Sequence, residues 1–229
     1  MKLEIAGIEN SIDLNEASIN ILEVENKSLF KKIVTDFNNI IKNDYETKEI
    51  ILSEEDNIKR IDKEVEIYID ILNIDFNSKE LLSKLYSRIE KNILLEQSVD
   101  IKLLQILQEL RTYMNEIVLE FPFDCNMKNE IQIKDLIKCL DIKLNTDYAE
   151  SLEEKLFLLF DIIAEFNLKK ILIFANLKSY FEDETLIEIY KSAIKNNLNL
   201  ILIESKLCSE KIKYEKKLII DKEFDDFYN

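Results

Sequence analysis

A glutamate and a lysine two residues apart could act on a phosphodiester bond. Glu204 ends the apolar run LNLILIE (198–204), and together with Lys206 it matches the E-x-K half of a metal-dependent nuclease signature. In such enzymes carboxylates hold a divalent cation that activates water. These folds also need an acidic residue at the end of the neighbouring strand, where this sequence has Asn176. Because E-x-K also arises readily by chance in so charged a chain, a carboxylate–metal nuclease stands as the alternative hypothesis.

The residue types that are missing exclude most other catalytic mechanisms. The chain of 229 residues has no histidine, one glycine (Gly7) and one proline (Pro122). A phosphate-binding loop needs several glycines for close backbone approach, so a P-loop and a dinucleotide-binding turn are both excluded. Without histidine there is no Ser–His–Asp triad and no His-ligated zinc. Metal binding would depend mainly on carboxylates, which suit Mg²⁺, Ca²⁺ or Mn²⁺.

Four carboxylates near the middle of the chain could bind such a cation. Glu116 and Glu120 are four residues apart and share one face of a predicted helix. Asp124 follows that helix and Glu130 begins the next element. A Ca²⁺ ion, which takes roughly six to eight oxygen ligands, would relieve their mutual repulsion. A solvated helix face in an acidic protein explains the same spacing, so the residues alone leave both interpretations open.

Basic residues in two short segments could contact the phosphates of a nucleic acid. Phosphate contact needs positive charge but no fixed motif, so any one of these residues could equally be a solvated surface side chain. The candidates are Lys134, Lys138 and Lys143 in one segment, and Lys59, Arg60 and Lys63 in the other.

The overall charge and the cysteines limit the partners and the compartment. A net charge of −15 argues against coating of nucleic acid over the whole surface, but it leaves room for a local basic patch. Cys125, Cys139 and Cys208 are odd in number and widely spaced, which indicates reduced thiols in a cytosol. No leader and no apolar run of about 18 residues is present, so we expect a cytoplasmic protein without a membrane segment.

Strand and helix patterns at both ends of the chain predict an α/β unit that would position these residues. KKILIFAN (169–176) and LNLILIE are continuous apolar runs, typical of parallel strands buried on both faces. Ser151 and Glu154 form a capping box that predicts a helix to about 167. Further strands are expected at 2–8, 18–24, 48–52, 64–72 and 216–220, and further helices at 29–42, capped by Ser28, and at 183–196.

The middle of the chain has a helical pattern instead. Helices are predicted over 78–96, 100–121 and 131–140, and Pro122 ends the second. That helix carries a heptad-like stripe, which needs a partner helix from the same chain or a second subunit. The predicted fold class is therefore α/β, with a partly parallel sheet in a head domain (1–77 and 144–229) and an inserted α-helical leg domain (78–143). The stripe consists of Leu103, Leu107, Leu110, Met114, Ile117 and Phe121.

Five segments together give the chain a family resemblance. In their order and spacing they resemble the accessory spacer-acquisition proteins of subtype II-A CRISPR systems, and they cover most of the chain. None is a catalytic signature. The segments are SLFKKIV (28–34), IYIDILNIDFNS (67–78), EIQIKDLIKCLDIKLN (130–145), KKILIFAN and LNLILIES (198–205).

The resemblance implies a fold, an assembly and partners. In that family the head is nucleotide-hydrolase-like without a phosphate loop. Four chains form a ring whose basic hole encloses the end of double-stranded DNA, and Ca²⁺ bound near the leg stabilises it. The implied partners are a CRISPR integrase complex and an effector nuclease. Family members are more acidic around the proposed ligands, where this chain has Pro122, Phe123, Cys125 and Met127, so its metal binding is expected to be weaker or differently arranged.

We therefore expect a non-catalytic, sequence-independent binder of double-stranded DNA ends, working as a calcium-stabilised homotetramer. The nuclease using Glu204 and Lys206 is the alternative. A helical interaction protein without nucleic-acid contact is a third hypothesis.

Overall fold

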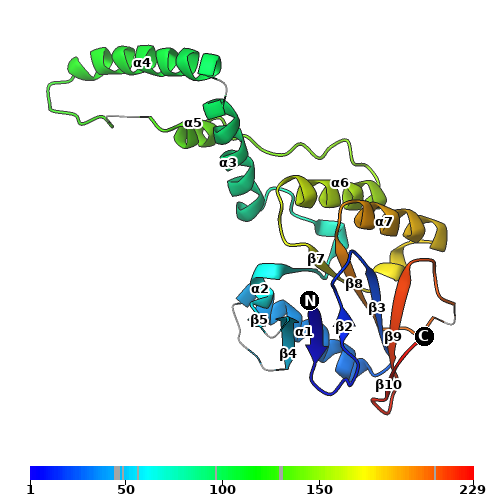
Figure 1. Cartoon of the computed structure of the whole chain (residues 1–229). Coiled ribbons are helices and arrows are strands. Elements are labelled where there is room, and N and C mark those ends of the chain that lie inside the picture. Colours follow the sequence, from blue (N-terminus) through cyan, green and yellow to red (C-terminus); the bar gives the residue numbers. More distant parts are fainter. Residues whose placement is uncertain (44–46, 48, 56, 96, 129–130, 209) are drawn as a thin grey trace. The chain divides into compact units, whose positions relative to one another are not determined.

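The computed structural model describes residues 1–43, 47, 49–55, 57–95, 97–128, 131–208 and 210–229. The chain divides into two compact units (Figure 1). Unit 1 comprises Met1–Ile74 and Thr146–Asn229, and unit 2 comprises Asp75–Asn145. The first is an α/β structure and the second is helical.

A six-stranded, mostly parallel sheet forms the centre of unit 1 (Figure 1). Five adjacent strands run parallel to one another, and the sixth, at one edge of the sheet, pairs antiparallel with its neighbour. The predicted α/β class with a partly parallel sheet is thus confirmed. The strands, in spatial order, are β6 (Val65–Tyr68), β7 (Ile171–Ala175), β8 (Asn199–Glu204), β3 (Ile19–Val24), β9 (Glu215–Ile220) and β10 (Asp226–Tyr228).

Both faces of this sheet are covered by helices. Successive side chains of a strand point to opposite sides, so each strand packs against helices on both faces. Ile173 of β7 joins a core cluster with Ile33 and Phe37 of α1 (Lys27–Asn43). The next residue, Phe174, points the other way and packs edge-on against Phe160 of α6 (Leu152–Glu165), with ring centroids 6.5 Å apart. The α7 helix (Asp183–Lys195) packs beside α6. This double cover explains the uninterrupted apolar runs of β7 and β8.

A second, antiparallel sheet extends the core of unit 1. Its order is β2 (Ile12–Asp13), β1 (Lys2–Ile5), β4 (Ile50–Glu54) and β5 (Asn57–Lys59). Leu3, Ile5, Ile50 and Leu52 enter the same cluster as α1. The short helix α2 (Ile61–Glu64) then leads into β6.

Local hydrogen bonds moved some element boundaries from their predicted positions. The α1 helix begins two residues earlier than expected, because the Asn26 side chain, rather than Ser28, accepts from the N–H groups of Ser28 (3.0 Å) and Leu29 (3.1 Å). The strand predicted over 64–72 ends at Tyr68, since Asp70 accepts from the Leu72 N–H (3.1 Å) and starts the 3₁₀ turn η1 (Ile71–Asn73). The predicted capping box of Ser151 is confirmed.

Asparagine takes the place usually held by glycine where two helices of unit 1 end. Asn167 after α6 and Asn197 after α7 are left-handed, with φ of 47° and 56°. Each is followed by a leucine whose N–H donates to the carbonyl oxygen five residues earlier in the helix, from Leu168 to Ile163 and from Leu198 to Ala193, both at 3.0 Å. These are Schellman motifs, which satisfy the last carbonyl groups of a helix.

Unit 2 consists of α3 (Lys79–Leu95), α4 (Gln97–Leu119) and α5 (Ile133–Cys139). The α4 helix ends before Pro122 in tight turns, in which the Glu120 N–H bonds the Ile117 carbonyl at 3.2 Å. Of the predicted stripe, Leu107 is buried, whereas Leu110, Met114 and Ile117 remain 46%, 42% and 36% exposed. No helix in the described part of the chain is long and apolar enough to cross a membrane.

The double-sided cover of the parallel sheet can be tested at Leu202, which is fully buried in the middle of β8. Leu202→Ala should lower the free energy of unfolding by about 2–5 kcal/mol, because it leaves a cavity that the surrounding strands cannot fill. Urea denaturation monitored by circular dichroism measures the change. Leu207→Ala, at a leucine that is 44% exposed, is the control and should stay within about 0.5 kcal/mol of the parent.

Candidate functional site: basic surface residues and a buried charge network

The proposed calcium ligands are spread over the end of α4 and the segment after it. Glu116 lies on α4, Glu120 in the turn that follows and Asp124 in a segment without regular secondary structure, and all three are exposed. Glu130 lies outside the described residues. Within the described ranges no three Asp, Glu, Cys or His side chains come close enough together to hold a metal ion. The three described carboxylates do not by themselves gather the roughly six or more oxygens that Ca²⁺ needs, and the calcium assignment stays a prediction.

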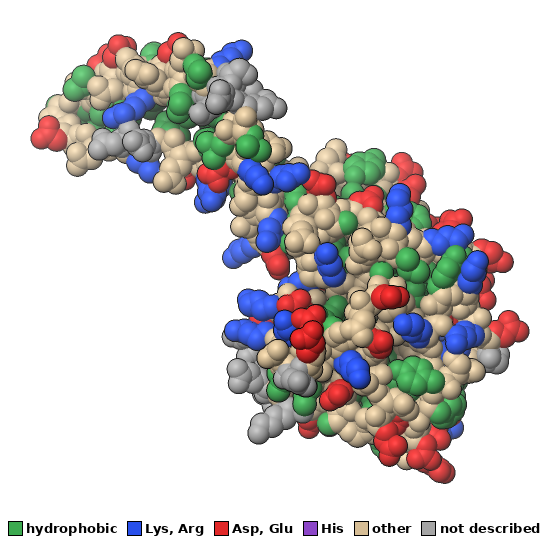
Figure 2. Space-filling model, viewed as in Figure 1, with side chains coloured by type: hydrophobic (Ala, Val, Ile, Leu, Met, Phe, Trp, Pro, Cys, Tyr) green, Lys and Arg blue, Asp and Glu red, His purple; other side chains and the backbone are tan. Residues whose placement is uncertain are grey.

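Most of the predicted phosphate-binding residues already have an acidic partner. Figure 2 shows basic and acidic side chains interspersed over the visible face of unit 1. Exposed pairs of this kind are weak, about 0–1 kcal/mol, so a phosphate could displace the carboxylate. The N–O distances are 2.8 Å for Lys59–Glu54, 2.8 Å for Arg60–Asp62, 3.6 Å for Lys63–Asp62, 3.3 Å for Lys134–Glu90 and 2.6 Å for Lys143–Asp141.

Lys138 differs from the other five predicted residues. It is exposed on α5 and, among the residues that the structure describes, has no carboxylate within ion-pair distance. The nearby Asp135 is hydrogen-bonded to Lys128, which lowers the pKa of Asp135, with a smaller contribution from Lys138. Lys138 therefore has the least neutralised charge of the predicted set.

The two residues of the nuclease alternative lie in different environments. Glu204 ends β8 with only 4% of its surface exposed, and its carboxylate accepts from the Lys178 N–H at 3.0 Å. Lys206 is exposed and forms no hydrogen bond or ion pair with the described residues. A metal-dependent nuclease needs carboxylates that both a cation and a phosphodiester can reach. The geometry of Glu204 does not meet that need.

Glu204 belongs instead to a network of buried charges on the α6–α7 side of the sheet. Glu23 of β3 is its register partner on the adjacent parallel strand. Glu23 Oε1 lies 3.1 Å from Nζ of Lys217 on β9, and both side chains are fully buried. That oxygen has no well-aligned hydrogen bond, so its attraction to Lys217 is electrostatic. The same ammonium group donates to the carbonyl oxygens of Cys208 (2.8 Å) and Glu210 (3.1 Å).

Glu215, at the start of β9, is the third buried carboxylate of the network. It accepts from Lys178 Nζ (2.8 Å), the Tyr190 hydroxyl (2.9 Å) and the Ile212 N–H (3.1 Å). Burial and the negative charge of Glu215 raise the pKa of Tyr190, so that the hydroxyl remains a donor. None of these three residues of the network (Glu215, Lys178 and Tyr190) was predicted, although charged residues inside the apolar runs INILEV and EKKLII indicate buried charge.

Burial raises the pKa of Glu204 to about 7. The Lys178 N–H and ammonium group act in the opposite direction, while the negative charges of Glu23 and Glu215 add to the rise. Three carboxylates share two ammonium groups, so a proton on Glu204 relieves the excess negative charge inside the unit. The network can therefore hold a proton near neutral pH.

This proton should make stability depend on pH. The folded-state pKa of about 7 lies above the ordinary value of 4.5, so the folded chain binds a proton that the unfolded chain lacks between these values. Stability from this group should rise as pH falls from about 8 to 5, by at most about 2–3 kcal/mol. Glu204→Gln, which is neutral throughout, should remove this part of the dependence. Urea midpoints at several pH values measure it.

The matched control for that measurement is Glu188→Gln on the exposed side of α7. It should leave the pH profile of the parent unchanged. Identical profiles for the parent and Glu204→Gln would contradict a protonated Glu204.

Comparisons with known proteins agree on one family. The family model described as CRISPR-associated protein (Cas_Csn2) matches residues 42–224. A protein of Enterococcus faecalis named CRISPR-associated protein Csn2 is 23% identical over 164 residues, which cover 71% of this chain and 72% of that protein. The crystal structure of Stu0660 of Streptococcus thermophilus has the same fold, with a TM-score of 0.60 at 14% identity over 96% of this chain and 75% of that one. Because the family model spans most of the chain and reaches into both units, the chain belongs to the CRISPR-associated Cas_Csn2 family.

Proposed function

We propose that this protein binds the ends of double-stranded DNA without sequence preference during CRISPR spacer acquisition, as a non-catalytic, ring-forming homotetramer. The observation that carries the CRISPR role is the family match over residues 42–224. The family resemblance supports the ring and the DNA end as its ligand. Further partners in this proposal are the integrase complex and the effector nuclease of the same system.

The exposed half of the α4 stripe supports self-assembly. Leu110, Met114 and Ile117 recur at heptad-like spacing and stay partly exposed within unit 2. Burying such apolar surface contributes roughly 25 cal/mol per Å², which favours association with another helix. In a closed homo-oligomer that helix comes from another copy of the chain.

Weakly paired basic residues support reversible, sequence-independent DNA contact. Lys134 and Lys143 sit in exposed ion pairs that a phosphate could replace, and Lys138 has no such pair among the described residues. A four-fold assembly would repeat these charges around its axis, so modest local charge would add up to a strong field. Affinity should then fall steeply with salt, because each phosphate contact releases counterions.

The burial of Glu204 supports a non-catalytic role. Its carboxylate is hydrogen-bonded inside unit 1, and Lys206 lies outside that network. The nuclease alternative would require unit 1 to open before a cation could reach Glu204. Calcium stabilisation of the ring is a separate proposal, which rests on the family resemblance.

Enclosure of a DNA end predicts a topological preference. Linear duplex should bind more tightly than a covalently closed circle of equal length and sequence, because only the linear form can thread through a closed ring. A gel-shift titration at low salt compares the two, and equal affinities would contradict threading. Running it in Ca²⁺ and in EDTA tests the cation, since calcium stabilisation predicts tighter binding of linear DNA in Ca²⁺.

The same samples, supplied with Mg²⁺ or Mn²⁺, test the alternative. Cleavage that disappears in Glu204→Ala would favour the nuclease and overturn the non-catalytic role. No shift of either DNA at low salt would contradict DNA binding altogether.

Charge pairing predicts unequal contributions from neighbouring lysines. Lys138→Ala should weaken binding of linear duplex more than Lys143→Ala, because Lys143 must first give up Asp141. Fluorescence anisotropy at several salt concentrations measures both, and the Lys138 variant should lower the slope of log K against log salt by about 1. Lys191→Ala, on α7 of unit 1, is the control. Equal effects of all three substitutions would contradict a contact at Lys138.

A further inference from the structure

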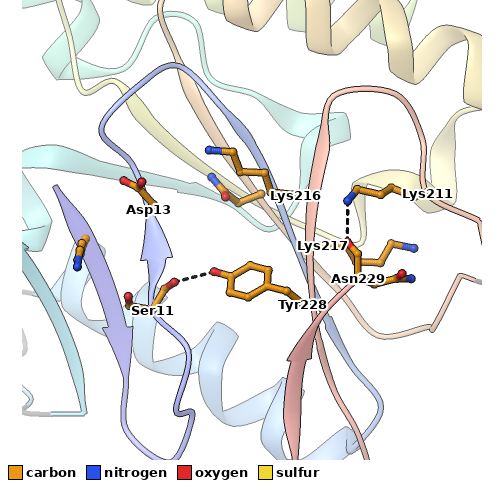
Figure 3. Close-up of a pocket in the computed structure, with 9 residues that line it drawn as sticks. Ser11, Asp13, Lys211, Lys216, Lys217, Tyr228 and Asn229 are labelled. Carbon is orange, nitrogen blue, oxygen red and sulfur yellow. Dashed lines mark hydrogen bonds between the residues drawn. The ribbon is translucent and has the colours of Figure 1, made fainter.

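An open pocket of about 490 Å³ lies in unit 1 where the two sheets approach each other (Figure 3). The pocket is lined by Lys2 of β1, Asp13 of β2 and Lys216 of β9. Tyr228 of β10 also lines it, and Asn20 of β3 is one of its buried residues. This volume falls within the roughly 300–1,000 Å³ of typical small-molecule sites. No residue of this pocket was among the predicted functional residues.

The pocket gathers positive charge that lacks acidic partners. Lys2 and Lys216 are exposed and, in the described part of the chain, have no carboxylate within ion-pair distance. Asp13 is the only acidic side chain of the described lining. This differs from Lys59, Arg60 and Lys63 of the same unit, which all have carboxylate partners. In a chain of net charge −15, two unneutralised lysines beside one cavity favour an anion.

Several pocket groups are held in place before any ligand arrives. Lys211 Nζ donates to the Asn229 carbonyl oxygen at 2.6 Å, which leaves two of its three N–H bonds for a ligand. The Tyr228 hydroxyl donates to the Ser11 carbonyl oxygen at 2.6 Å, so the ring spans from β10 to the segment before β2 (Figure 3). At the buried end, Asn20 donates through Nδ2 to Ser18 Oγ at 2.9 Å. Such fixed groups lower the ordering cost of binding.

The Tyr228 ring adds a second kind of recognition. It is 49% exposed, so one part of its surface is available to a ligand while its hydroxyl is fixed. Burial of the hydroxyl and the charge of Asp13 raise the pKa of Tyr228, which keeps the hydroxyl a donor. An exposed aromatic face beside lysines is the combination that binds nucleotides, with the ring stacking on the base and the ammonium groups contacting phosphate.

We propose that this pocket binds a nucleotide, with Lys2 and Lys216 contacting its phosphates and Tyr228 stacking on its base. Lysine supplies three donors and no acceptor, which suits the oxygens of a phosphate. The nucleotide is either free or the phosphorylated terminal residue of a DNA strand, since both present the same chemistry. Binding of the free nucleotide does not depend on the function proposed above, whereas binding of a DNA terminus does.

The test is calorimetric titration of the full chain with ADP and with pyrophosphate at low salt. We expect saturable binding of both, with one site per chain. Lys2→Ala and Lys216→Ala should each weaken both ligands roughly tenfold, because each removes a charged hydrogen bond. Tyr228→Leu should weaken ADP several-fold and leave pyrophosphate nearly unchanged, because only ADP has a base to stack.

Lys191→Ala is the matched control, since Lys191 is an exposed lysine of the same unit outside the pocket. It should bind both ligands as the parent does. Urea midpoints check that each variant is folded. No saturable binding of either ligand, or equal losses in Lys191→Ala and Lys216→Ala, would overturn the proposal.

Competition identifies the source of the nucleotide. A short duplex with a 5′-phosphate should displace ADP better than the same duplex without it if the pocket takes a DNA terminus. If neither duplex displaces bound ADP, the pocket takes the free nucleotide and the proposal stands. ADP binding in a protein that never shifts DNA would thus separate failure of the proposed function from failure of this site.

Discussion

The ion pair between Glu23 and Lys217 is the constraint on which much of unit 1 depends. Both side chains are fully buried, and removing two charges from water costs several kcal/mol per ion unless other groups compensate. Here the compensation comes from the segment between β8 and β9. The Cys208 N–H bonds Glu23, and Lys217 bonds two carbonyl groups of the same segment. The pair thereby fixes the path of the chain from β8 into β9, and β9 in turn carries β10 and one wall of the pocket.

The same network changes what the sheet can do. In open α/β proteins the carboxyl ends of parallel strands are the usual place for a ligand. In this chain Glu23 and Glu204 occupy that edge, and their oxygens are taken up by Lys178, Lys217 and backbone N–H groups. Charged groups at a sheet edge are therefore not sufficient evidence for catalysis, because side chains can satisfy one another where a substrate would otherwise sit.

Patterns that depend on neighbouring residues were predictable from the sequence. The apolar runs of β7 and β8 predicted buried parallel strands, and Ser151 with Glu154 predicted the start of α6. Boundaries were less accurate where two cap residues compete, as Asn26 and Ser28 do before α1. The basic residues could be located, but their pairing could not, because Lys134 meets Glu90 only when α3 and α5 pack together. Lys217 was missed because a lysine that follows another lysine in a short strand is normally expected to face water, whereas β9 lies between β3 and β10 inside the sheet. Whether the proposed calcium ligands lie close together could not be predicted either, because spacing along the chain does not give the separation of Glu116 and Asp124 in space.

The asparagines that end α6 and α7 bear on the unfolded chain as well as the folded one. A left-handed backbone strains any residue with a Cβ atom, and asparagine tolerates it better than most because its short amide bonds locally. Glycine would remove that strain but would give the unfolded chain more conformations to lose on folding. The chain has a single glycine in 229 residues. The folded state therefore carries a small backbone strain at these two helix ends, and the unfolded chain has fewer conformations to lose on folding. Part of its stability thus comes from the limited conformational freedom of the unfolded polypeptide, which no contact in the folded structure reveals.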